Sequence, residues 1–165
     1  EGLSLKMPES EKEPRDVVRA KAKRLTSAKK ANFIEGRLGL IIDGTGKDYD
    51  KIAGQATKLK QLGYDVHMIF VNTSLDVALE RNAKRDRTVP ESIAIKSWND
   101  VQRNIGKFSQ YFRQNFVVVD NNDPLENDGM IFNSVFKQIK RLANKKPTSK
   151  IAMAWIANEL EKKKR

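Results

Sequence analysis

The chain has 165 residues, 39% of them hydrophobic, which is enough for one domain with a real core. It has no cysteine and one histidine, which excludes disulfide-stapled folds and cysteine-based zinc sites and disfavours imidazole metal clusters and Ser-His catalysis. The net charge of +11 is concentrated in residues 15–30 and 137–165, which carry +6 and +8, so the remainder is close to neutral.

The first half of the chain is predicted to contain two helices and two strands after an irregular start. In chain order these are a lead-in over 1–14, a helix over 15–36, a strand over 39–43, a helix over 52–62 and a strand over 65–71. Gly36 and Gly63 supply the two helix ends. The run "LGLII" is too short and too β-branched for a helix, so it predicts a buried strand that ends at Asp43.

The second half is predicted to be mostly helical, with one further strand. Thr73 and Ser74 can cap a third helix, and Pro90 breaks the chain after it. Beyond the break we expect a helix over 95–106 that Gly106 stops, a short aromatic helix over 107–112, a strand over 116–120, and helices over 131–142 and 151–160. Strands that alternate with long helices predict an α/β fold with a parallel sheet flanked by helices.

The turn "GTGK" after the first predicted strand raises the possibility of a phosphate-binding loop. A P-loop requires G-x-x-x-x-G-K-[ST], in which backbone amides surround a phosphate and the hydroxyl holds magnesium. Here Asp48 follows Lys47, and Ile41 stands five positions before Gly46, so both ends of the motif fail. No other stretch of the sequence fits the motif.

Three stretches, taken in order, resemble the P-loop nucleotide kinases. "LIIDGTGK" is similar to the third strand of adenylate kinase-like enzymes, "LERNAKRDR" to their lid with its spaced arginines, and "FVVVD" to their last core strand. The sequence looks most like small P-loop kinases of tailed bacteriophages, which are distantly similar to zeta-toxin kinases. The resemblance covers about residues 15–125 and implies one domain, in which 1–14 lead into a kinase-like core and 126–165 form basic C-terminal helices.

The resemblance also implies that some elements are missing from this sequence. Family members begin with a strand, the P-loop and its helix, and a second strand, and none of these precedes the helix expected at Arg15. The chain therefore looks like the carboxyl-terminal two thirds of such a kinase, a partial P-loop NTPase fold without its first strands. In the family sheet order 2-3-1-4-5, the missing first strand would lie between the strands ending at Asp43 and Asn72.

The resemblance assigns roles to residues at the strand ends and in the lid. Asp43 would bind Mg²⁺ through water, or else cap the next helix. Lys47 and Thr45 would bind the acceptor substrate, unless Lys47 is simply solvated. Arg81 and Arg85, expected on one helix face, would hold the transferred phosphoryl group with Arg87; the alternative is a salt-bridged surface with Glu80 and Asp86. Asp120 and Asn121 would contact the adenine of ATP, or form a plain turn.

Two functions follow from these patterns. One is transfer of a phosphoryl group from ATP to a small molecule, a nucleotide or a nucleic-acid end. Because the sequence has no P-loop, we expect this chain alone to be inactive. The other is a non-catalytic basic module that binds nucleic acid or an acidic partner.

The sequence also carries expectations about location and assembly. Its apolar runs are far shorter than the roughly 20 residues of a membrane span, and no secretory signal is visible, so a cytoplasmic protein without membrane contact is expected, in line with the bacteriophage resemblance. Because a sheet without its middle strand leaves open edges, we also expect a homo-oligomer.

Overall fold

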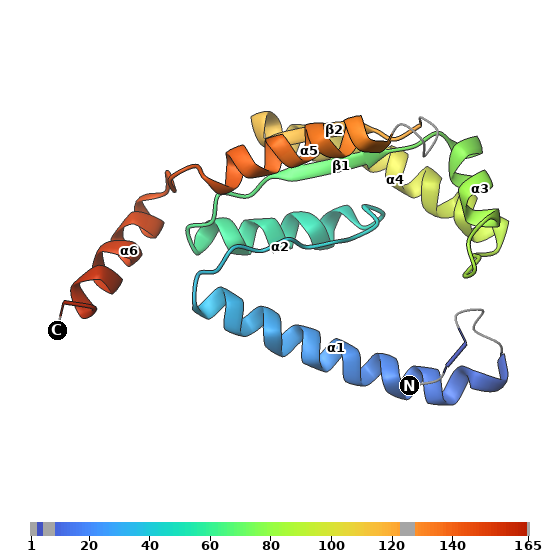
Figure 1. Cartoon of the computed structure of the whole chain (residues 1–165), viewed down its shortest axis with the longest axis horizontal. Helices are drawn as coiled ribbons and strands as arrows, with labels where there is room; N and C mark the ends of the chain where they lie inside the picture. Colours follow the sequence, from blue (N-terminus) through green and yellow to red (C-terminus); the bar gives the residue numbers. More distant parts are fainter. Residues whose placement is uncertain (1–2, 5–8, 123–127, 165) are drawn as a thin grey trace.

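The computed structural model describes residues 3–4, 9–122 and 128–164. The expected boundary between the kinase-like core and the C-terminal helices, at 125–126, lies outside the described residues. Figure 1 shows an elongated arrangement in which helices surround a short sheet, and the last helix extends away from the rest.

Ten elements are described, and their order alternates as an α/β fold requires. They are η1 (Glu9–Glu11), α1 (Lys12–Glu35), α2 (Tyr49–Gln61), β1 (Met68–Asn72), α3 (Leu75–Ala83), α4 (Glu91–Phe112), η2 (Arg113–Asn115), β2 (Phe116–Asp120), α5 (Asp128–Ala143) and α6 (Lys150–Lys162). Helical structure thus begins at Glu9, so the expectation of an irregular lead-in to residue 14 is wrong over its second half.

The sheet consists of β1 and β2, which pair in parallel with Met68 opposite Phe116 and Asn72 opposite Asp120. The predicted parallel pairing of the strands near 65–71 and 116–120 is confirmed. The fold is therefore an α/β fold with a parallel sheet flanked by helices, consistent with a partial P-loop kinase-like fold. Parallel pairing requires a long crossover, and α3 and α4 supply it.

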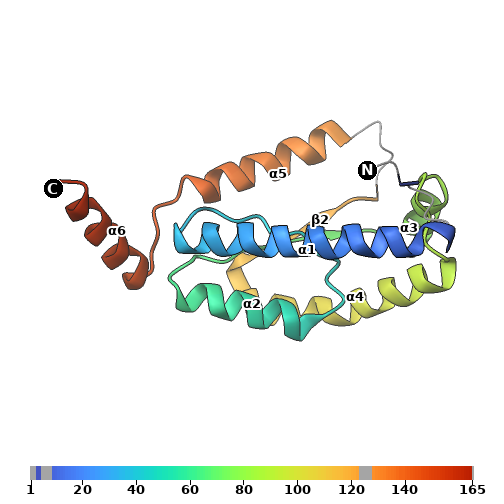
Figure 2. The same ribbon diagram turned by 90° about the horizontal axis from the view of Figure 1, so that it is seen from below.

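The predicted strand over 39–43 is wrong. Residues 38–45 are extended, but within the described part of the chain residues 39–45 make no backbone hydrogen bond. Figures 1 and 2 place this segment beyond the edge of β1 that β2 leaves open, with α1 farther out. Ile41 is 90% exposed, which no buried strand would allow. A strand exists only where a neighbour pairs with it, and here the neighbour is absent.

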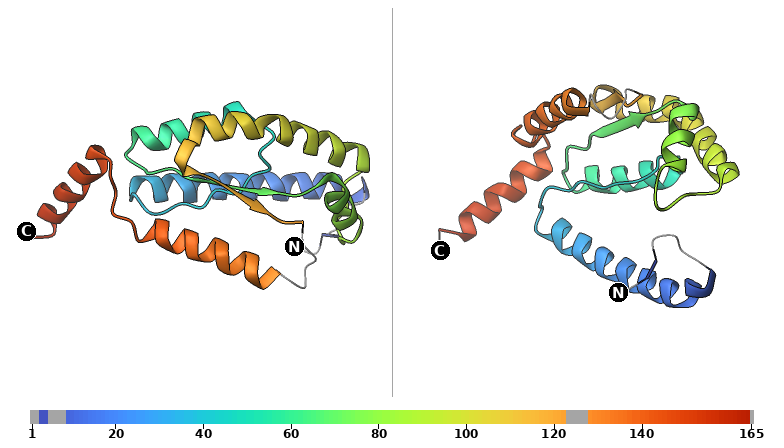
Figure 3. Two further views of the ribbon diagram at one scale, coloured as in Figure 1. Left: turned by 90° about the horizontal axis from the view of Figure 1, so that it is seen from above. Right: turned by 45° about the vertical axis from the view of Figure 1, so that its right-hand side comes forward.

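The core lies between the sheet and one pair of helices. Phe70 of β1 packs with Ala56 of α2 and with Phe108 and Phe112 of α4, and all four side chains are buried. Phe108 also lies 5.3 Å from Tyr49, measured between ring centroids. Figure 3 shows α2 and α4 along one side of the strands and α5 along the other. Among the described residues, this buried cluster lies on the side of the sheet with α2 and α4.

Helix α4 continues through Gly106, so the predicted stop there is wrong. Glycine in a helix costs about 1 kcal/mol relative to alanine, a weak signal that packing can override. Buried Asn104, Phe108 and Phe112 lie at helical spacing on either side of Gly106 and hold the helix to the core. The helix ends instead at Arg113, whose φ of 50° is left-handed.

Helices α1 and α6 contribute little to the core. Neither has a buried residue among those described, and Leu25 of α1 is 58% exposed. Figure 1 and the right-hand view of Figure 3 show α1 as a straight helix set apart from the sheet. The start of α6 is held by Thr148, whose backbone N and Oγ1 donate to the Asp65 carboxylate at 3.1 and 3.0 Å.

Candidate functional site

The carboxyl ends of β1 and β2 are joined by amide groups. The backbone N of Asn121 donates to the carbonyl of Asn72 at 2.9 Å, which extends the strand pairing by one bond. The Asn72 side chain accepts from Gln102 of α4 at 2.9 Å. Asp120 accepts from the backbone N of Asn122 at 3.1 Å, a hydrogen bond that is typical of a turn that begins with aspartate.

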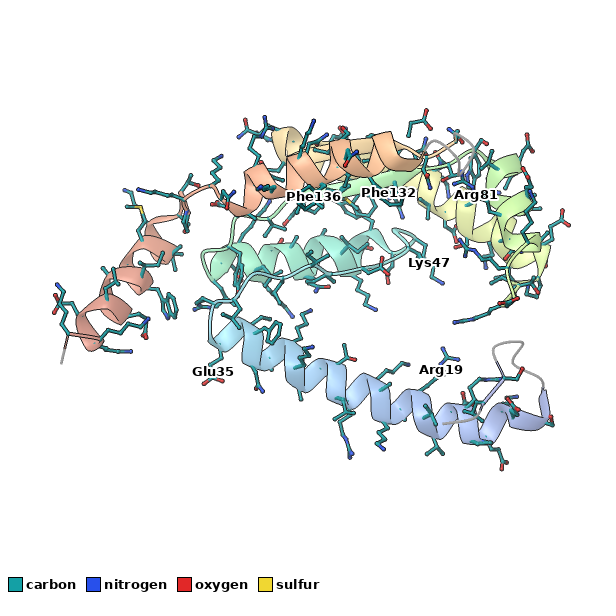
Figure 4. All side chains as sticks on the ribbon, viewed as in Figure 1. Arg19, Glu35, Lys47, Arg81, Phe132 and Phe136 are labelled. Carbon is teal, nitrogen blue, oxygen red and sulfur yellow. The ribbon has the colours of Figure 1, made fainter. Side chains whose placement is uncertain are left out.

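Arg81 lies at these strand ends. Its Nη1 donates to the Asn121 carbonyl at 2.8 Å, and Figure 4 shows its side chain on the side of the molecule where β1 ends and α5 begins. The structure therefore brings together two residues for which the sequence predicted separate roles, one at the transferred phosphoryl group and one at the adenine. The bond attaches the end of α3 to the end of β2.

The expectation that Arg81 and Arg85 share a helix face is wrong, because α3 ends at Ala83 and Lys84 caps it. We call residues 84–90 the lid loop. It carries Arg85 and Arg87, both exposed. The alternative, a surface on which the arginines pair with Glu80 and Asp86, stays a prediction. Glu80 pairs with Lys84, and this hydrogen bond lowers the pKa of Glu80.

The base of the lid loop is held by Asn82, which the sequence analysis missed. Its Nδ2 donates to the Val89 carbonyl at 2.7 Å, and its Oδ1 accepts from the Val89 backbone N at 3.0 Å. An asparagine at a helix end is a weak sequence signal, because the same residue also favours ordinary turns.

Lys47 follows a tightly held turn. Gly46 is buried with a φ of 76°, a backbone conformation that favours glycine. Asn104 of α4 donates through Nδ2 to the carbonyls of Gly46 and Lys47, at 3.1 and 2.9 Å. Asp48 caps α2 by accepting from the backbone N of Lys51 at 3.0 Å. The acid after Lys47 thus has a structural role, and Asp43 is not the cap of this helix.

A shallow open groove of about 610 Å³ runs beside Lys47, and we call it the Lys47 groove. Its charged lining comes from the turn before α2, from α2 itself and from α4: Lys47, Asp48, Asp50, Lys96, Asp100 and Lys107. Two of the three acids already bind elsewhere, Asp48 at the α2 cap and Asp100 to Arg103. A hydrogen bond or an ion pair does not remove the charge of a carboxylate, so the groove remains balanced between three lysines and three aspartates.

Asp43 and Thr45 lie in the extended segment before this turn, and both are exposed. Across the described parts of the chain, no three or more histidine, cysteine, aspartate or glutamate side chains gather as a metal site would require. Figure 4 shows Lys47 pointing into the open space toward α1, whereas Arg81 lies at the strand ends. The predicted residues therefore fall into two groups, one around Lys47 and one around Arg81, and the residues that line the Lys47 groove include none of the second group.

Comparison with known proteins places this arrangement in a family. The family model for zeta toxin matches residues 6–128, about three quarters of the chain. No curated protein matches the sequence, and no solved structure matches the fold. Among the described residues, none of the helices combines the length and the apolarity needed to cross a membrane.

Proposed function

Because the chain belongs to the zeta toxin family, a P-loop kinase-like and nucleotide-binding family, we propose that it supplies lid and acceptor groups to an ATP-dependent phosphoryl transfer. The observation that carries this proposal is the Arg81–Asn121 hydrogen bond of 2.8 Å. It joins the helix that leads into the lid loop to the strand end assigned to the nucleotide. Catalysis of phosphoryl transfer rests on the placement of cationic groups around the phosphates. The bond fixes the end of α3, and with it the start of the loop that carries the lid arginines, relative to the strand ends.

Each group of residues has a place in this proposal. Arg85 and Arg87 of the exposed lid loop bind the oxygens of the transferred phosphoryl group, and Asp120 and Asn121 lie beside the adenine. Asp43 binds the water shell of Mg²⁺, whose preference for carboxylate oxygen suits an exposed aspartate. Lys47 and Thr45 bind the acceptor at the Lys47 groove, whose lining supplies the positive charges of Lys96 and Lys107 beside three aspartates. An acceptor that already carries a phosphate suits this charge, as does a nucleotide or a nucleic-acid end.

The finer assignment to kinases like those of bacteriophages or to adenylate kinase-like enzymes is part of this proposal, and it rests on the sequence motifs alone. The sequence of 165 residues contains no G-x-x-x-x-G-K-[ST] motif. We therefore expect negligible ATP turnover by this chain alone, because no other segment offers a ring of backbone amides for the β-phosphate. Turnover that Asp43→Ala abolishes would contradict this expectation.

Binding of fluorescent ATP with Mg²⁺ tests the proposed lid. The double variant Arg85→Ala/Arg87→Ala removes both guanidinium groups and should weaken ATP binding about tenfold or more. The reason is that a hydrogen bond to a charged group contributes up to about 3 kcal/mol. Arg24→Ala/Arg141→Ala, which removes two exposed arginines from α1 and α5, is the matched control and should bind as the unmodified protein does. Equal binding by both double variants would count against the lid assignment.

A second function is favoured by the exposure of the basic helices. Residues 15–30 carry seven lysines and arginines against one aspartate, and α1 has no buried residue among those described. Such a surface suits the phosphate backbone of a nucleic acid. The proposal predicts that affinity for a DNA duplex falls steeply as salt rises. A flat salt dependence, or no binding at low salt, would exclude this second function.

A further inference from the structure

The end of α3 and the start of α4 are tied together by one side chain. Asn82 donates to the Val89 carbonyl at 2.7 Å and accepts from the Val89 backbone N at 3.0 Å, as one strand residue would pair with another. Of the common side chains, only asparagine and glutamine offer a donor and an acceptor in this planar arrangement. The pair closes a short ring of chain that contains Arg85 and Arg87.

The stem of this ring is attached to the sheet on both sides. On the α3 side, Arg81 donates to the Asn121 carbonyl at the end of β2, at 2.8 Å. On the α4 side, Nε1 of Trp98 donates to the Thr73 carbonyl just after β1, at 2.8 Å. The helices that flank the lid loop are therefore fixed to the strand ends, and the Asn82–Val89 pair fixes the loop to the helices.

We propose that Asn82 is a positioning residue: by holding the base of the lid loop, it presents Arg85 and Arg87 as a preformed binding site for polyphosphate oxygens. This inference rests on the proposed function of the two arginines. A loop that is ordered before the ligand arrives loses less conformational entropy on binding, so affinity rises without any new contact. Asn82 itself touches no phosphate in this arrangement.

The test uses Asn82→Ala, Asn82→Asp and a control, Asn99→Asp. Asn99 lies exposed on α4, so the control makes the same charge change without touching the loop. Two measurements are made on each protein: the rate of trypsin cleavage after Arg85 and Arg87, which reports loop order, and the affinity for inorganic tripolyphosphate, which reports the arginines without an adenine. Arg85→Ala/Arg87→Ala gives the affinity that remains without them.

We expect Asn82→Ala to be cleaved about tenfold faster and to bind tripolyphosphate about three- to tenfold more weakly, because both hydrogen bonds are lost. In Asn82→Asp, a carboxylate still accepts from the Val89 N but repels the Val89 carbonyl. Protonation near pH 4 restores the donor, so the affinity of this variant, relative to Asn99→Asp at the same pH, should recover as the pH falls from 7 to about 4. The other charged groups of this region are the same residues in both proteins: Glu80, Lys84, Arg85, Asp86, Arg87 and Glu91.

The outcomes separate the inference from the function on which it rests. If Asn82→Ala leaves tripolyphosphate affinity unchanged while Arg85→Ala/Arg87→Ala lowers it, the positioning role is wrong and the lid assignment stands. If the double arginine variant also binds unchanged, both fail together. Absence of the relative recovery of Asn82→Asp at low pH would likewise overturn the positioning role, even if the alanine variant were weakened.

Discussion

Side-chain amides connect segments that are distant in the sequence. Asn104 holds the turn before Lys47, and Asn115 donates to the Val66 carbonyl at 3.2 Å just before β1. Gln102 donates to Asn72 at the end of β1. Each of these amides satisfies a backbone carbonyl or a side chain on another element, so the loops around the proposed site are held by directional bonds rather than by a large apolar core.

Replacing Asn104 should destabilise the protein. Asn104 is 8% exposed and donates to two carbonyls, which Asn104→Leu would leave without this donor. Unsatisfied buried carbonyls cost about 1–3 kcal/mol, so the free energy of unfolding in urea should fall by about this amount. Asn99→Leu, at an exposed position of the same helix, should change it by less than about 0.5 kcal/mol. Equal effects of the two variants would mean that the Asn104 bonds contribute nothing.

His67 should make stability depend on pH. Burial lowers the pKa of His67 below its ordinary value of 6.5, with Asp65 raising it and Lys145 lowering it. As the pH falls, the unfolded chain therefore protonates His67 before the folded protein does. The contribution of neutral His67 to the free energy of unfolding is complete above about pH 6.5, and it is lost as the pH falls to the lower pKa of the folded protein. His67→Gln should reduce the loss of thermal stability between pH 7.5 and about 5.5. An identical pH profile for this variant would contradict the prediction.

At the scale of the elements, the local sequence pattern predicted the helices and the β1–β2 pairing. It did not predict features that depend on contacts with distant residues, namely the absence of a strand at 39–43 and the continuation of α4 past Gly106. The apolar run at 38–42 has strand character, yet its pairing needed a neighbouring strand that the described residues do not supply. Gly106 has helix-breaking character, yet the stripe of Phe108 and Phe112 carried the helix past it. The site divides in the same way: Lys47 and the lid arginines could be proposed from motifs, whereas the loop bond of Asn82 and the long-range bonds of Asn104 leave no motif in the sequence.

Alanine at two glycines should separate the effects of backbone conformation and helix propensity. Gly46 has a φ of 76°, and a Cβ there would meet Val101 and Phe70 only at 3.7 and 3.8 Å, so Gly46→Ala should cost about 1–2 kcal/mol through its backbone alone. Gly106 lies inside α4 with nothing within 4 Å of an added Cβ, so Gly106→Ala should stabilise by up to about 1 kcal/mol. Chemical denaturation of both variants checks the opposite signs.

At the scale of the whole molecule, apolar surface remains around the open edge of the sheet. Val71 and Val118 of the two strands are 57% and 50% exposed. Phe132 and Phe136 of α5 are 67% and 63% exposed. Two-stranded sheets are marginal in water, and clustered apolar side chains of this size favour burial against a further surface.

We therefore propose that this chain self-associates, with a second copy covering the open edge of β1 and the segment over 38–45. Residues 39–45 offer unpaired backbone groups, and Ile41 is 90% exposed, so an added strand would gain both hydrogen bonds and apolar contact. The charge of +11 opposes association, but the screening length is about 8 Å at physiological salt, so basic helices that point outward interfere little.

Sedimentation equilibrium at micromolar concentration checks this assembly, with a dimer or larger species expected. Ile41→Lys should shift the protein toward monomer, because it places a charge in the proposed contact while removing nothing that the folded monomer buries. Leu160→Lys is the matched control: Leu160 is 55% exposed on α6, which Figure 1 shows extending away from the sheet, so it should leave the association unchanged. A single monomeric species in both low and high salt would mean that the open edge needs no second copy, and the two strands with their helices would then be stable by themselves.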